Sequence, residues 1–190
     1  LFNDAPGLRI DATAWSGQTL HDLEQGKLDF AFGGVDSAPA GIYRAVLGRS
    51  TYVCATSSQN PVKITLDTYC SQGHVVPTLE GFGKNPIDSA LAELGRQRNV
   101  VIRTPHFMSG LATVAQTHLV MVVPQALALA ASMHYSLSLH PLPFTVEMPP
   151  FCLLWHQRHH RSPAHQWFRQ WLMQRIGAIF GMSPPDPVQP

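Results

Sequence analysis

Residues 100–132, VVIRTPHFMSGLATVAQTHLVMVVPQALALAAS, contain two copies of one pattern, an apolar strand followed by a helix. Val100–Thr104 and Leu119–Val123 have the length and apolar content of buried strands. Met108–Gln116 and Gln125–Ser132 carry apolar residues at helical spacing. Because parallel neighbours in a sheet need a crossover helix between them, this alternation predicts α/β architecture with mostly parallel sheets.

The same alternation extends to both sides of this stretch. The further predicted elements are strands at Leu8–Ala14, Leu28–Phe32, Arg44–Thr56, His74–Thr78, Leu137–Leu142 and Phe151–Gln157, and helices at Gly17–Gln25, Leu66–Ser71 (N-cap Thr65), from Pro86, and at Pro163–Ile176 (N-cap Ser162). The chain is expected to leave one sheet near His74 and to return near Pro143. This predicts two lobes, residues 1–75 with 144–190 (lobe I) and residues 76–143 (lobe II), with a crevice between them.

The composition is that of a folded domain, since 45% of the 190 residues are hydrophobic and 13% are charged. Lys and Arg number 13 and Asp and Glu 12, so the net charge of +1 gives no reason to expect nucleic-acid binding by this chain. No apolar run approaches the roughly 18 residues of a membrane span, and no secretory signal opens the sequence. The widely spaced Cys54, Cys70 and Cys152 predict no disulfide framework and favour a reducing, cytoplasmic setting.

Several short motifs occur in an order typical of one protein family. They are Gly26–Phe32 (GKLDFAF), Asn60-Pro61 with Thr65-Leu66-Asp67, the set Ile87, Asp88, Leu91, Gly95 and Arg98, then Val120–Pro124, and Leu153–His156 followed by Ser162-Pro163-Ala164. From about Pro6 to Leu172 the chain therefore resembles the effector-binding domain of LysR-type transcriptional regulators, with Asn60 where the family usually has His. The run WHxR…SPAHxWFR most resembles the branch that includes regulators of aromatic-compound and nodulation genes.

The resemblance implies a two-lobed periplasmic-binding-protein-like fold of type 2, in which each lobe is a mostly parallel sheet flanked by helices. It also implies a small-molecule effector between the lobes, and pairing into a homodimer or homotetramer. In the family, DNA is bound by a separate N-terminal winged helix-turn-helix, which these residues do not contain. The first strand of the family's effector domain also has no counterpart here.

Three turns are predicted to line the crevice, because each follows a strand at its carboxyl end. They contain Gly33, Gly34 and Val35; Phe82, Gly83 and Lys84; and His106, Phe107, Met108 and Ser109. Glycines let the backbone approach a ligand closely, although a simple turn would also explain Gly33-Gly34. Lys84 is a candidate anion partner, and its alternative is a solvated surface lysine.

The turn at His106 combines the features that suit an anionic, aromatic effector. Backbone N–H groups at a helix start bind carboxylates, His106 could donate a further hydrogen bond, and Phe107 could stack on a ring. In the alternative interpretation Phe107 belongs to the core and His106 is a surface residue.

The histidines His156, His159, His160 and His165 raise the question of a metal site. No acidic residue lies between residues 148 and 185, and the glutamate of the zinc motif H-E-x-x-H is missing. The strand-to-helix turn is also expected to separate these side chains. The sequence therefore predicts no metal and no cofactor other than the effector.

Catalysis is not expected either. The sequence shows no nucleophile elbow, no phosphate-binding loop and no paired carboxylates. A solute-binding protein or an enzyme of the same two-lobed fold is the alternative class.

Overall fold

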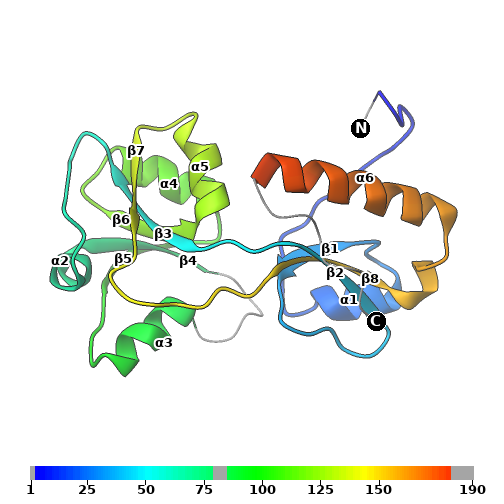
Figure 1. Ribbon diagram of the computed structural model, residues 1–190, viewed down its shortest axis with the longest axis horizontal. Helices are drawn as coiled ribbons and strands as arrows, with labels where there is room; N and C mark the ends of the chain where they lie inside the picture. The colour runs from blue at the N-terminus through cyan, green and yellow to red at the C-terminus, as the bar shows by residue number, and fades with distance from the viewer. Residues whose placement is uncertain (1–2, 79–84, 181–190) are drawn as a thin grey trace.

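Two separate sheets form the cores of two lobes that lie side by side and are joined by two crossings of the chain (Figure 1). The computed structural model describes residues 3–78 and 85–180. Lobe I contains β1 (Ala31–Gly34), β2 (Ile42–Gly48), β8 (Phe151–His156), α1 (Thr19–Gln25), the 3-10 helix η1 (Gln157–His159) and α6 (Pro163–Phe180). Lobe II contains β3 (Tyr52–Ser57), β4 (Gly73–Pro77), β5 (Asn99–Thr104), β6 (Val120–Pro124), β7 (Leu137–Pro141), α2 (Leu66–Ser71), α3 (Pro86–Glu93), α4 (Phe107–Ala115) and α5 (Gln125–Ser132).

The five-stranded sheet of lobe II has the order β5-β4-β6-β3-β7. Alternate residues of its strands face opposite sides, as the pleat requires. Val53 and Met121 pack with α4 and α5, whereas Cys54 and Val122 pack with α2 and α3. Lobe II is therefore a sheet between two helical layers, which confirms the α/β class.

Lobe I is a smaller sheet with β8 in the centre, in the order β1-β8-β2. Leu154 of β8 packs with α1 on one face, and Leu153 and Trp155 pack with α6 on the other. Trp155 is fully buried, and the Arg169 guanidinium lies 4.5 Å from its ring centroid, a cation–π contact. Among the described helices, none combines the length and apolar character needed to cross a bilayer.

The expected strand directions need correction. In lobe I both pairings of β8 are antiparallel. In lobe II β4 is parallel to β5 and β6, but β3 is antiparallel to β6 and β7. The sheet of lobe I is therefore antiparallel and that of lobe II is mixed. β3 and β8 each enter their sheet from a chain crossing, and no crossover helix joins them to a parallel neighbour.

The predicted lobe boundary at residue 75 is also wrong. Arg44–Thr56, expected as one strand, is two strands in different sheets, and the chain crosses between Gly48 and Tyr52. β3, α2 and β4 therefore belong to lobe II. The pattern of β-forming residues is the same whether the run pairs with one sheet or divides between two, so the sequence alone does not show the division.

The predicted strand Leu8–Ala14 does not form. Residues 7–16 lie outside both sheets, and the Ile10 side chain is 52% exposed. Alternation favours an extended chain, but a strand also needs a neighbouring edge for its N–H and C=O groups.

Beneath α2 and α3, lobe II buries a histidine. His74 is fully buried, its Nε2 lies 2.7 Å from the Tyr69 carbonyl oxygen, and its ring meets the Tyr69 ring edge to face. His74 Nδ1 has no partner among the described residues. Burial opposes the charged imidazolium and lowers the pKa of His74 to about 4, despite the opposing effect of the bond to Tyr69.

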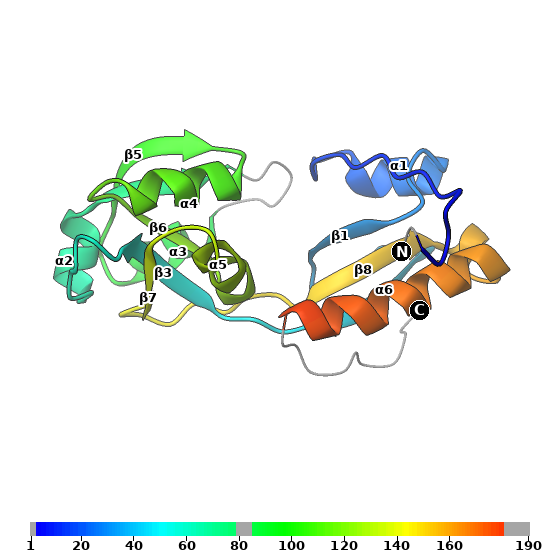
Figure 2. The ribbon, with the colours of Figure 1, turned by 90° about the horizontal axis from the view of Figure 1, so that it is seen from above.

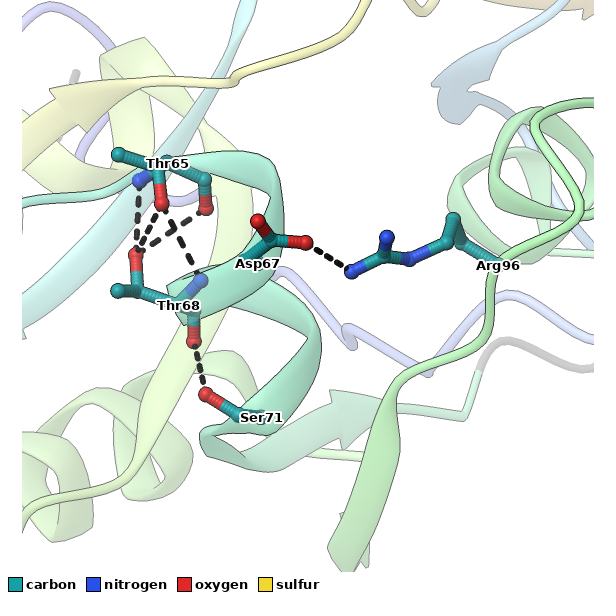
Figure 3. Close-up of polar contacts among 5 residues, drawn as sticks. All are labelled: Thr65, Asp67, Thr68, Ser71 and Arg96. Carbon is teal, nitrogen blue, oxygen red and sulfur yellow. Dashed lines mark hydrogen bonds and ion pairs between the residues drawn. The ribbon is translucent and has the colours of Figure 1, made fainter.

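Two arginines of lobe II make ion pairs in different surroundings. Arg98 Nε donates to Asp88 Oδ1 at 2.7 Å, and the Arg98 side chain is only 1% exposed against 47% for Asp88. Arg96 pairs with Asp67 on the surface, beside the α2 N-terminus (Figure 3). There Thr65 and Thr68 each accept a hydrogen bond from the other's backbone N–H, a reciprocal cap of the kind that stabilises helix starts.

The buried histidine should make stability depend on pH. An unfolded chain has a histidine pKa of about 6.5, so between pH 6.5 and 4 the unfolded state binds more protons than the folded state. The contribution of His74 is therefore fully present above pH 6.5 and is lost as pH falls through this window, by about 3 kcal/mol in total. Urea denaturation at several pH values should show this slope, and His74→Gln should flatten it. An unchanged slope in the variant would show that His74 is not its source.

The two ion pairs allow a matched comparison. Asp88→Asn leaves a buried guanidinium without its counter-charge and should lower the free energy of unfolding by about 2 kcal/mol. Asp67→Asn, also in the first turn of a helix, should cause no measurable loss because its pair with Arg96 is solvent-exposed. Equal losses in chemical denaturation would contradict this assignment of burial.

Candidate functional site

The carboxyl ends of strands from both lobes face one another. β5 points toward lobe I and β1 runs toward lobe II (Figure 2). α4 begins three residues after β5 ends, so its N-terminus lies at this same edge of lobe II. In open α/β sheets, ligands bind outside the carboxyl ends of the strands, which makes this region the candidate site.

Within residues 3–78 and 85–180, the N-terminus of α4 carries free hydrogen-bonding capacity. His106 is its N-cap, with extended backbone angles (φ −112°, ψ 107°) and no side-chain capping bond. The His106 N–H donates to Thr104 Oγ1 at 3.1 Å, and the Gly110 N–H donates to the His106 carbonyl. The first amides of a helix have no partner within the helix, so this turn presents N–H donors at the positive end of the helix dipole.

The side chains of this turn differ in exposure. Phe107 is partly buried and packs against the apolar core beneath α4. His106 and Ser109 are exposed, and Met108 is 39% exposed. Among the described contacts Phe107 is therefore a packing residue, and a stacking role for its ring stays a prediction. His106, Met108 and Ser109 are the side chains that a ligand at this turn would meet.

In lobe I, the end of β1 is closely packed. A Cβ at Gly33 would lie 2.8 Å from the Trp15 ring, and a Cβ at Gly34 would lie 3.0 Å from Pro149 Cγ. The Val35 N–H donates to the Pro150 carbonyl, and the Val35 carbonyl accepts from Arg44 Nη1. The two glycines therefore allow close packing at this edge, and whether they also contact a ligand stays a prediction.

Sequence reasoning missed two features of this region. Trp15, four residues before the start of α1, covers Gly33. The available signal was a tryptophan in a polar stretch before a predicted helix. Thr51, in the first crossing, accepts from the Gln125 N–H at 2.8 Å and donates from Oγ1 to Gln125 Oε1 at 2.9 Å. These bonds tie the crossing to the N-terminus of α5, a long-range pairing that spacing along the chain could not indicate.

The second predicted turn, Phe82, Gly83 and Lys84, lies outside the described residues. Immediately after it, the Asn85 side chain accepts from the Ile87 N–H at 3.0 Å and caps α3. This cap starts α3 at Pro86, as the sequence predicted.

Two lobes joined by two crossings, with strand ends that face each other, define the periplasmic-binding-protein-like class of small-molecule-binding domains. The family described as "LysR substrate binding domain" matches residues 1–177. The chain belongs to this family.

Curated relatives and solved structures agree with the family. The chain is 29% identical over 174 residues to the transcriptional activator NahR of Pseudomonas putida. The aligned region covers 90% of this chain and 58% of NahR. The chain is 32% identical over 177 residues to the transcriptional regulator SyrM of Rhizobium meliloti, covering 89% of this chain and 53% of that protein. The chain thus spans little more than half the length of these relatives.

The regulatory domain of MexT, a transcriptional activator of Pseudomonas aeruginosa, superposes with a TM-score of 0.79 at 26% identity, covering 91% of this chain and 87% of that one. The BenM effector-binding domain with its effector benzoate superposes with a TM-score of 0.69 at 16% identity, covering 98% and 85% of the two chains, and shows the shared fold.

The contact at the end of β1 can be tested directly. Gly33→Ala should lower the free energy of unfolding by about 1–3 kcal/mol, because its methyl group would overlap the Trp15 ring. Gly7→Ala is the control, since a Cβ there meets nothing within 4 Å. Urea denaturation measures both, and a Gly33→Ala variant as stable as the control would exclude the close Trp15 contact.

Proposed function

We propose that this chain senses a small anionic or aromatic effector bound between its lobes and thereby modulates transcription in an intact LysR-type regulator. The observation that carries this proposal is the uncapped N-terminus of α4, placed by β5 at the edge of lobe II that faces lobe I. The proposal includes no catalysis and no cofactor, in keeping with relatives described as transcriptional activators and regulators.

The preference for an anion follows from the donors of the turn. Backbone N–H groups and the helix dipole favour negative charge, and residues 104–109 contain no acidic side chain that would repel it. His106 supplies an exposed imidazole at the same place. An aromatic carboxylate would satisfy these donors and place its apolar ring against the Met108 side chain.

The signal would be a change in the relative orientation of the lobes. An effector that contacts both lobes stabilises the orientation in which both sets of contacts form. Each crossing is a single segment of chain, and the first is tied to α5 by Thr51 and Gln125, so small changes there can turn one lobe against the other.

The intact regulator would transmit this change through pairing and through DNA contacts outside this chain. We infer a cytoplasmic homodimer or homotetramer whose N-terminal winged helix-turn-helix binds DNA, in line with the helix-turn-helix relatives. Ligand binding by one domain then shifts the equilibrium of the whole assembly.

A matched pair of substitutions at the first residue of α4 tests the site. Phe107→Ala removes the ring and keeps the N–H; Phe107→Pro removes both, and proline is tolerated at this helix position. The difference between the two variants therefore reports the N–H alone. Relative to Phe107→Ala, Phe107→Pro should weaken binding of an aromatic carboxylate by about tenfold, the loss expected for a hydrogen bond to a charged group.

The measurement is ligand-induced stabilisation followed by calorimetric titration. A panel of benzoate-type carboxylates and amino-acid-like anions, each with its uncharged amide as control, should raise the melting temperature for one class of acids and not for the amides. Equal affinities of the Ala and Pro variants would place the carboxylate elsewhere, and the absence of any shift across the panel would contradict the proposed ligand class. Chemical turnover of a bound compound would favour an enzyme of the same fold.

A further inference from the structure

Three side chains from distant parts of lobe I converge at its far end. One ligand atom each of Asp29, His159 and His165 lies within 4.8 Å of the others. Asp29 precedes β1, His159 ends η1, and His165 lies in the first turn of α6. The start of α6 lies at the end of lobe I that points away from lobe II (Figures 1 and 2), so this cluster is separate from the α4 turn.

The structure removes the main sequence argument against a metal ion. No acidic residue lies between residues 148 and 185, so no carboxylate is close to these histidines along the chain. Asp29 supplies a carboxylate from a segment 130 residues earlier in the chain, because β1 pairs with β8. The expected separation of the histidines is also wrong for this pair, since the rings of His159 and His165 stack with centroids 4.4 Å apart and planes 4° from parallel.

The spacing of the cluster suits one tetrahedral ion. His165 Nε2 lies 3.4 Å from Asp29 Oδ1, which is longer than a strong hydrogen bond between a nitrogen and a carboxylate oxygen. Two ligands about 2.0–2.1 Å from a tetrahedral zinc ion are roughly 3.3 Å apart. The observed distance therefore fits two ligands of one ion better than a strong direct bond.

The surroundings hold one ligand firmly and leave another adjustable. The His165 side chain is 11% exposed, and its ring centroid lies 4.2 Å from that of Phe30. Asp29 is 74% exposed and His159 lies on a surface turn. Two parallel rings cannot both direct a lone pair at one ion, so binding would turn the His159 ring about its side-chain bonds.

We propose that Asp29, His159 and His165 form a site for a single divalent transition-metal ion, zinc in the first instance. Imidazole and carboxylate ligands suit zinc, and three protein ligands leave the fourth position for water. The neutral imidazole ring is the form that binds a metal ion. The bound ion would link the start of β1 to the start of α6.

The positive charge of Arg169 opposes binding of the ion. Arg169 donates to the carbonyls of His159 and His160, so its guanidinium lies close to the cluster and lowers the affinity for a cation. Its bonds also hold the η1 turn against α6, which keeps His159 beside His165. Arg169 thus positions the ligands of the site and also lowers the affinity of the site for a cation.

The test uses the chain without a polyhistidine tag, stripped with a chelator and then titrated with zinc in competition with a chromophoric chelator. The wild-type chain should bind one equivalent and gain melting temperature. Asp29→Asn and His165→Gln should each weaken binding by at least about tenfold. His134→Gln, a histidine of lobe II outside the cluster, should bind as the wild type does.

Any other outcome would contradict the proposed metal site. Wild-type affinity in Asp29→Asn would show adsorption on surface histidines, and equal loss in His134→Gln would show binding elsewhere. Asp29 is mostly exposed, so Asp29→Asn should fold normally, and its melting temperature without zinc verifies this. Cobalt in place of zinc should give the visible absorption of tetrahedral coordination in the wild type and lose it in Asp29→Asn; an octahedral spectrum in both would contradict the geometry. None of these outcomes depends on effector binding at α4.

Discussion

The position of β8 between β1 and β2 is the constraint on which the rest of lobe I depends. β8 enters from lobe II, and its residues Cys152 to Trp155 are fully buried. Without it, β1 and β2 would share no hydrogen bonds, because each pairs with β8. β8 also carries the apolar residues that receive α1 on one face and α6 on the other. The register pairs Ala31 with Leu154, so the chain before Ala31 lies beside the chain after Leu154. This register brings Asp29 beside the η1 turn, which leads into α6.

Lobe II depends in the same way on a strand that enters from a crossing. β3 lies between β6 and β7, and its alternate residues join the two helical layers. With this sheet in place, the strands β4, β5 and β6 run in one direction, and the helices that follow β5 and β6 begin at the edge facing lobe I. The position of the α4 start at this edge is thus a consequence of strand direction. The amides that would bind an anion are positioned by the sheet, and the exposed side chains of His106 and Ser109 add to them.

The polar groups of lobe II show how burial changes the structural role of a residue. His74 and Arg98 are hidden beneath α2 and α3 and are held by the Tyr69 carbonyl and by Asp88. Arg96, two residues before Arg98, pairs with Asp67 at the surface. In the sequence, both arginines follow the helix predicted from Pro86, and although the family motif includes Arg98, no local pattern says which side chain is buried. Only the path of the chain into β5 turns one inward and leaves the other in water, where salt and solvent weaken its pair.

The sequence by itself determined the α/β class, the family and most helices and strands, including Leu66–Ser71 and Gln125–Ser132 at their observed bounds. These follow from local periodicity, caps and prolines, which act over a few residues and are visible in the letters. Local patterns also placed His106 at the start of a helix that follows a strand.

Tertiary structure alone decided that Arg44–Thr56 divides between two sheets, that Leu8–Ala14 has no strand partner, that Trp15 covers Gly33, and that Asp29 meets His159 and His165. The first two depend on which strand edge a segment meets, and the last two on side-chain contacts between segments that the fold brings together. Hydrogen bonds between strands are formed by residues far apart in the chain. The backbone groups that make them are the same in every residue except proline, so the amino-acid sequence carries little local trace of the choice.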